Sequence, residues 1–303
     1  MNIYYGYSIV STLGFFYTLY GTLQHLGIRG FISNIIRFET NNIAMAIYED
    51  YAIGFYSLRY VLVISFGWAL FRVLIHKRVS LVDLLNIFLF LFYIAFFGRR
   101  LQLICSIFVF IGLLGTQREL PRHFNVRKVL MVGVFIFGML IIATTLRNYN
   151  SYEELGYSSP IWVTLANISS YLGAPFQVSL GIGNNFSDAL RGVPYQELTD
   201  IHYTLTANSA FTSMIELYGI TGFVYMMVII FGFGLLAGWL HANRSNYLFT
   251  GYPILMYAFA ELWRINLFST GIFFTLLITA VFIPFIYTLL ITLIKNQVPN
   301  PNL

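Results

Sequence analysis

The sequence predicts an all-α integral membrane protein, a polytopic bundle of about eight transmembrane helices with one large periplasmic loop between helices five and six. The mean hydropathy is +0.74, 58% of the residues are hydrophobic and only 10% are charged. Ordinary soluble domains do not have this composition. Phenylalanine (30) and tyrosine (22) are abundant, as expected where aromatic rings sit at the membrane interface. Apolar stretches near the roughly 20 residues that a helical span needs recur along the chain.

Eight segments have the composition of spans and are separated by polar connectors. In chain order they cover 4–23, 51–75, 80–97, 101–115, 129–146, 214–240, 247–263 and 271–294. An even number of crossings places both termini on the same side of the membrane. We expect one membrane domain, 1–303. Within it, 1–146 carries helices one to five, 147–213 the large loop, and 214–303 helices six to eight with a cytoplasmic tail.

Cationic residues predict the orientation of the bundle. The lysines (Lys77, Lys128 and Lys295) all fall in connectors on one side, and the positive-inside rule makes that side the cytoplasm. The connectors on the other side carry arginine without lysine. These outward arginines are Arg29, Arg37, Arg99, Arg100, Arg147, Arg191 and Arg264. Because guanidinium is a planar donor fork that fits phosphate oxygens bidentately, we expect an outward-facing site that binds a diphosphate.

The large loop 147–213 is too long for a simple hairpin connection, and loops of that length are often functional. Aliphatic residues recur at helical spacing between Pro160 and Pro175. They are Ile161, Leu165, Ile168 and Leu172. This stripe predicts an amphipathic helix that lies at the outer membrane interface.

Three residues on the predicted outer side are candidates for catalysis. Glu216 stands at the start of the sixth span and could remove a proton from a hydroxyl, or could instead complement the helix dipole as a first-turn carboxylate. His202 in the large loop titrates near neutral pH and could act as a base or as a donor to phosphate. Arg147 ends the fifth span, where it could bind charge or anchor the helix at headgroup depth.

The remaining arginines differ in their settings. Arg59 lies inside the second span, where a charge costs at least about 2.5 kcal/mol, so we expect it to line a polar cavity. Arg264 follows Glu261 by three residues, which also predicts a local ion pair. Arg99 and Arg100 share a short turn.

No cluster of ligands at metal-binding spacing is present, so we expect neither a metal site nor another cofactor. No basic segment indicates nucleic acid.

Four passages together resemble the O-antigen polymerase family, the oligosaccharide repeat-unit polymerases of the bacterial inner membrane. FFGRRLQLI is similar to the family's outward arginine turn, and TTLRNYN to the arginine that opens its large periplasmic loop. SSYLGAPFQ is similar to an aromatic stretch of that loop. TANSAFTSMIELYGITGF resembles the family's Asn…Glu-x-x-Gly-x-x-Gly entry to the next span, with Asn208, Glu216, Gly219 and Gly222 at those positions. The passages cover 97–223, and the family's ten or more spans exceed the eight predicted here.

The resemblance implies glycan polymerisation at the periplasmic face. A growing glycan on undecaprenyl diphosphate would pass to the sugar of a new lipid-linked repeat unit in membrane lipid, with a chain-length regulator protein as a further partner. The residues that would bind the diphosphate are Arg99, Arg100, Arg147, Arg191 and Arg264. Glu216, His202 and Arg147 would be catalytic, because fixed cations stabilise the leaving group's charge and a base accepts the acceptor's proton. Arg59, Asn208 and Gly219 would complete the pocket.

Two other functions stay open from the sequence. Glu49 and Asp50 precede the second span and could supply the base of a glycosyltransferase that uses a polyprenyl monophosphate sugar. Arg59 could instead line the path of a flippase or another transporter of lipid-linked oligosaccharide. Transporters commonly show internal repeats and broken helices, and the sequence shows neither clearly.

Overall fold

The computed structural model describes residues 3–49, 55–77, 79–97, 100–117, 126–184, 209–243 and 247–297. Every regular element within these ranges is helical, so the prediction of an all-α fold is confirmed. Helices that are long and apolar enough to cross a membrane cover Phe55–Leu74, Leu130–Asn150, Ile220–Ala242 and Gly271–Leu290. Shorter apolar helices cover Leu81–Phe97, Leu101–Gly115 and Leu248–Ala260. The eight-span arrangement and the periplasmic loop stay predictions.

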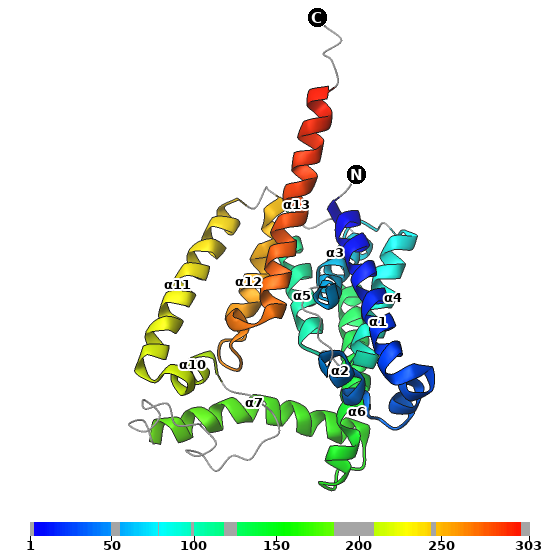
Figure 1. The fold of residues 1–303 in the computed structure, drawn as a ribbon, viewed down its shortest axis with the longest axis vertical. Coiled ribbons are helices and arrows are strands. Elements are labelled where there is room, and N and C mark those ends of the chain that lie inside the picture. Colours follow the sequence, from blue (N-terminus) through cyan, green and yellow to red (C-terminus); the bar gives the residue numbers. More distant parts are fainter. Residues whose placement is uncertain are drawn as a thin grey trace, which may run out of the picture.

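The first predicted span lies inside a much longer helix. α1 (Ile3–Ile36) continues past the apolar stretch to Gly27, where a positive φ of 64° kinks it. Glycine adopts this left-handed conformation without the steric cost that a side chain would add. α2 (Thr40–Glu49) follows near the lower end of the bundle in Figure 1.

The second span begins as a 3-10 helix, η1 (Phe55–Val61), and continues as α3 (Leu62–Leu74). η1 lies directly against α1 at Gly14. The approach is so close that a side chain at Gly14 would collide with the backbone of Leu58. Small residues allow two helix backbones to approach in this way. The contact buries the end of η1, including Arg59.

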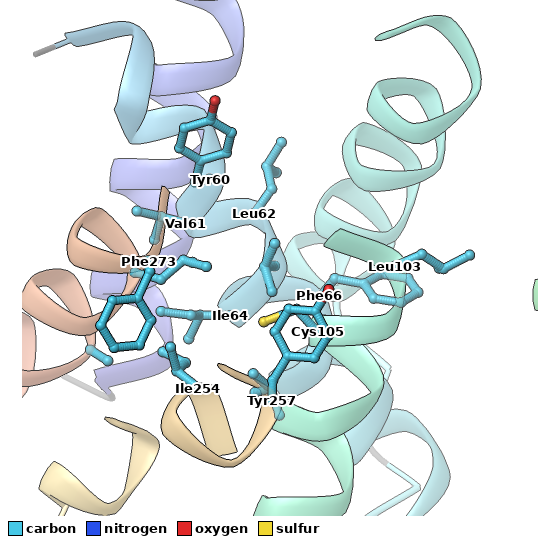
Figure 2. Packing of buried hydrophobic residues seen from close by; sticks show 14 of the residues in the cluster. Tyr60, Val61, Leu62, Ile64, Phe66, Leu103, Cys105, Ile254, Tyr257 and Phe273 are labelled. Atoms are coloured by element: carbon cyan, nitrogen blue, oxygen red, sulfur yellow. The ribbon is translucent and has the colours of Figure 1, made fainter. Parts of the chain in front are cut away.

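α3 is the centre of the hydrophobic core. α4 (Leu81–Phe97) and α5 (Arg100–Gly115) both pack against it. Figure 2 shows Ile64 of α3 beside Ile254, and Cys105 of α5 beside Tyr257. These contacts join the first half of the chain to its last third, so the bundle is one packed unit.

α6 (Val126–Glu153) runs beyond the predicted span 129–146, and α7 (Pro160–Asn184) follows after a short turn. Figure 1 shows α7 lying across the lower end of the bundle, whereas most other helices run along it. The helix predicted between Pro160 and Pro175 is therefore confirmed, and it continues through Pro175. Its position at a membrane interface stays a prediction.

The predicted span 214–240 is wrong at its start. α10 (Ala210–Tyr218) and α11 (Ile220–Ala242) are separate helices that meet at Gly219, whose φ of 60° breaks the helix. A side chain at Gly222 would collide with the Met214 carbonyl oxygen. The backbones of α10 and α11 therefore approach closely at this point, and the chain bends here instead of continuing as one span.

The last part of the chain returns upward. η2 (Tyr247–Thr250) leads into α12 (Gly251–Ala260), and a turn with η3 (Leu267–Ser269) leads into α13 (Gly271–Gln297). In Figure 1 the start of α1 and the end of α13 lie toward the same, upper end of the bundle. An even number of crossings would require this placement.

Candidate functional site

A buried ion pair occupies the turn that follows α12. Glu261 caps the helix, and Arg264 donates from Nη2 at 2.6 Å and from Nε at 2.9 Å to the Oε2 atom of Glu261. The two residues are only 7% and 8% exposed. The local ion pair predicted from the sequence is confirmed, although a turn holds it and not a helix. Because desolvation offsets much of the attraction in such a pair, stability alone does not explain its presence.

The first turn of α10 is bonded to this charged turn. The Ala210 backbone N–H donates to the Leu262 carbonyl oxygen at 2.9 Å. Ser209 caps α10 by accepting from the Thr212 N–H, and both side chains are buried. The positive end of the α10 dipole therefore lies against the turn that carries Arg264, and positive helix ends and guanidinium groups both favour an anion.

The first turn of α5 contacts the last turns of α12, just before this charged turn. The Tyr257 hydroxyl donates to the Leu101 carbonyl oxygen at 2.9 Å, across 156 positions of sequence. The Glu261 N–H donates to the Tyr257 carbonyl oxygen at 3.1 Å, so Tyr257 is one helical turn before the ion pair. The α5 helix begins at Arg100, so the backbone of Arg100 lies next to the bonded Leu101.

Two buried amide oxygens near these helix ends have no hydrogen-bond partner within the ranges that the structure describes. They are Oε1 of Gln102, in the first turn of α5, and Oδ1 of Asn266, two residues after Arg264. An unmet buried acceptor costs about 1–3 kcal/mol. Such a group calls for a specific reason, and a ligand that brings hydroxyl donors would supply one.

α7 approaches the turn from the lower side of Figure 1. The ring of Phe176 stacks against that of Trp263, with ring centroids 5.9 Å apart and an interplanar angle of 29°. The start of α10 and the second half of α7 therefore contact the turn after α12, and the start of α5 contacts the last turns of α12 just before it. The candidate site is this meeting point, with Arg264 and Glu261 at its centre.

The structure places several predicted site residues in or near this site. Arg264 is central, and the backbone of Arg100 lies at its edge. The side chain of Arg100 lies outside the described part of the chain. So do Arg99, Arg191, His202 and Asn208 in full, and their roles stay predictions.

Glu216 and Gly219 lie along α10, away from its bonded first turn. Glu216 is half-buried and sits in the last turns of the helix, because α10 begins at Ala210. The alternative of a first-turn carboxylate that complements the helix dipole is therefore wrong. Gly219 is the C-cap of α10 and its main contribution is the bend toward α11.

Arg147 lies inside α6 and not at its end, because the helix continues to Glu153. Its neighbours are bonded to the corner between α1 and α2. The Thr40 hydroxyl donates to the Leu146 carbonyl oxygen at 3.1 Å, and the Asn150 side chain donates to the Arg37 carbonyl oxygen at 3.0 Å. Arg147 is half-buried at this corner, and a pocket shared with Arg264 stays a prediction.

Arg59 is turned into the protein. It is 1% exposed, its Nη2 donates to the Tyr60 hydroxyl at 3.0 Å, and its guanidinium carbon lies 4.9 Å from the centre of the Tyr60 ring. A buried charge normally requires such partners. Its expected role in lining a cavity stays a prediction.

Sequence reasoning missed a second polar cluster, which ties the start of α4 to α3 and α1. Arg72 donates from Nε to Asp83 Oδ1 at 2.9 Å and lies over the Tyr4 ring at 4.7 Å. Asp83 also accepts from the backbone N–H and hydroxyl of Ser80. A signal was available, because Ser80 and Asp83 have the spacing of a capping box.

No family model matches the chain, and neither a curated protein nor a solved structure matches it. The described helices therefore define the class by themselves: an all-α chain with helices long and apolar enough for a multi-pass membrane protein. Within the ranges described above, no group of three or more histidine, cysteine, aspartate or glutamate side chains could hold a metal ion.

Proposed function

We propose that this protein is a polysaccharide polymerase of the O-antigen polymerase type. It transfers a growing undecaprenyl-diphosphate-linked glycan onto a new lipid-linked repeat unit at the periplasmic face of a bacterial inner membrane. One observation carries the proposal. Three of the four passages that resemble the family are distant in sequence, yet each contacts either the last turns of α12 or the turn that follows it. They do so through Leu101, Phe176 and Ala210.

The chemistry at this turn suits departure of a diphosphate. The acceptor hydroxyl oxygen bonds to the donor's anomeric carbon, the bond from that carbon to the diphosphate oxygen breaks, and the diphosphate leaves with the electron pair. Glu261 already orients the Arg264 guanidinium. Donors that are fixed in advance need no reorganisation as charge develops, so they lower the barrier. The proton from the acceptor hydroxyl passes to a base, for which Glu216 is the candidate within the described residues and His202 the candidate outside them.

The uncharged groups of the site support a glycan as the ligand. The side-chain oxygens of Gln102 and Asn266 have no hydrogen-bond partner among the described residues. They are free to accept hydrogen bonds from a ligand, and sugars carry many hydroxyl donors. A purely apolar ligand would leave both oxygens unmet at a cost of about 1–3 kcal/mol each. The site therefore combines a cation for the diphosphate with acceptors for sugar.

The test is glycan elongation by the purified protein in liposomes, with a lipid-linked repeat unit as substrate, a metal chelator present and no ion gradient. We expect the wild type to lengthen the glycan and Glu216→Gln to lose at least about 100-fold of the rate, as removal of a general base does. Glu154→Gln is the matched control, because Glu154 is exposed in the connector after α6.

Each alternative function has its own outcome in the same liposomes. Movement of a labelled lipid-linked oligosaccharide across the bilayer without elongation would indicate that the protein is a flippase and not a polymerase. Sugar transfer from a polyprenyl monophosphate, abolished by Glu49→Gln with Asp50→Asn, would indicate the other glycosyltransferase. Glu49 ends α2, and Asp50 lies outside the described ranges.

A further inference from the structure

Trp263 is the exception in the turn after α12. Between Glu261 and Asn266, only Trp263 is exposed, whereas the charged residues and Asn266 are buried. Trp263 is 39% exposed and its partner Phe176 is 62% exposed. The two rings stack with centroids 5.9 Å apart. Two aromatic faces from distant segments thus lie together at the open side of a buried polar cluster.

An aromatic pair in this setting has a specific chemistry. The face of an aromatic ring carries partial negative charge and a broad apolar surface. One face of a sugar ring presents C–H groups with partial positive charge, while its hydroxyls project from the edge. A sugar that lies on the Trp263 ring would direct its edge hydroxyls toward the turn, where the buried Oδ1 of Asn266, close to Trp263 in sequence, lacks a partner among the described residues.

Anchoring in the membrane interface is the other role that exposed tryptophan commonly has. Anchoring needs a ring at the correct depth, and it needs neither a second ring from another segment nor a neighbouring buried charge. Trp162 provides the comparison. It is also exposed, but it lies near the start of α7, whereas the contact with the turn comes from Phe176 in the second half of that helix.

We infer that Phe176 and Trp263 form a platform that binds a sugar ring of the lipid-linked glycan beside the Arg264–Glu261 pair. This inference rests on the proposed function and names the part of the substrate that the site recognises. The platform positions the sugar relative to the charged turn. It does not take part in bond making, so its loss weakens binding more than turnover.

The first measurement is the dependence of the elongation rate on the concentration of lipid-linked acceptor. We expect Trp263→Ala to raise KM at least about tenfold and to change kcat by less than about threefold, because lost ground-state binding acts on KM. Trp263→Phe keeps a ring and should recover most of the affinity. Phe176→Leu should give an intermediate KM, and Trp162→Ala should match the wild type.

The second measurement is direct binding of the repeat-unit oligosaccharide without its lipid, followed by isothermal titration calorimetry. The wild type should bind the free oligosaccharide, and Trp263→Phe and Phe176→Leu should show how much the platform contributes even if Trp263→Ala does not fold. Equal effects of Trp263→Ala and Trp162→Ala on KM, or unchanged oligosaccharide affinity in Phe176→Leu, would overturn the inference in favour of an interface anchor. If the wild type binds oligosaccharide but elongates none, the proposed function fails and the platform stands.

Discussion

Removal of one partner from the Arg264–Glu261 pair should lower the free energy of unfolding much more than removal of both partners. Arg264→Gln leaves the Glu261 carboxylate buried without its cation, at 7% exposure. Loss of one partner of a buried ion pair costs about 3–5 kcal/mol, because the remaining charge is uncompensated. Glu261→Gln leaves the guanidinium in the same position and should cost a similar amount.

The double variant Glu261→Gln with Arg264→Gln removes both charges and keeps two side chains that can hydrogen-bond to each other. Replacement of a buried pair by neutral groups is often nearly neutral. We therefore expect the double variant to lose only about 1 kcal/mol, far less than the sum of the two single variants. The difference is the coupling energy of a double-mutant cycle, which isolates the pair from its surroundings.

The assay is the free energy of unfolding in lipid–detergent micelles, measured for the wild type and the three variants, together with glycan elongation in liposomes. The double variant should fold almost as well as the wild type but elongate glycan at least about 100-fold more slowly, because the preorganised cation is absent. Additive single-variant costs would show that the pair is not coupled. A stable double variant with the wild-type elongation rate would refute a role for Arg264 at the reacting diphosphate.

Three further outcomes follow from the described contacts. Gly222→Ala inserts a methyl group against the backbone of α10, so elongation and thermal stability should both fall, whereas Gly232→Ala, in open space on α11, should change neither. Asp83→Asn removes the charge opposite Arg72 and should cost about 2 kcal/mol of unfolding free energy, while the elongation KM of the folded protein stays unchanged. Arg147→Lys keeps the charge but loses the donor fork, so glycan chains on the cell should shorten while the protein still inserts; chains of normal length would exclude a diphosphate contact there.

Several elements were predictable because apolar runs end where polar residues begin. The segments 80–97 and 101–115 match α4 and α5 within one residue at each end. The stripe from Ile161 to Leu172 predicted the first half of α7 by its helical spacing. In these stretches the local pattern and the tertiary structure favour the same helix, so no knowledge of distant contacts was needed.

The prediction failed where backbone geometry and hydropathy disagree. The stretch 214–240 is mostly apolar, but the positive φ of Gly219 splits it into two helices. Hydropathy does not report φ, and glycine is tolerated both inside and between helices of apolar proteins. The extension of α6 beyond Leu146 was missed for the opposite reason, since its last residues are polar although helical.

The candidate site was predictable only in its local part. The spacing of Glu261 and Arg264 predicts their ion pair. Their neighbours Leu101, Phe176 and Ala210 come from segments far away in the sequence. No sequence pattern joins a ring in α7 to a ring after α12, so the aromatic pair could not have been foreseen.

Composition and periodicity by themselves determined an all-α chain with helices apolar enough to cross a membrane, because burial of the peptide groups in an apolar chain of this kind requires helices. They also determined where arginine and carboxylate lie along the chain. Only the tertiary structure decided which of them are buried together. Burial depends on packing between segments that are distant in sequence. That packing buries Arg264 with Glu261 in a turn that α7 and α10 contact, and so fixes the position of its charge.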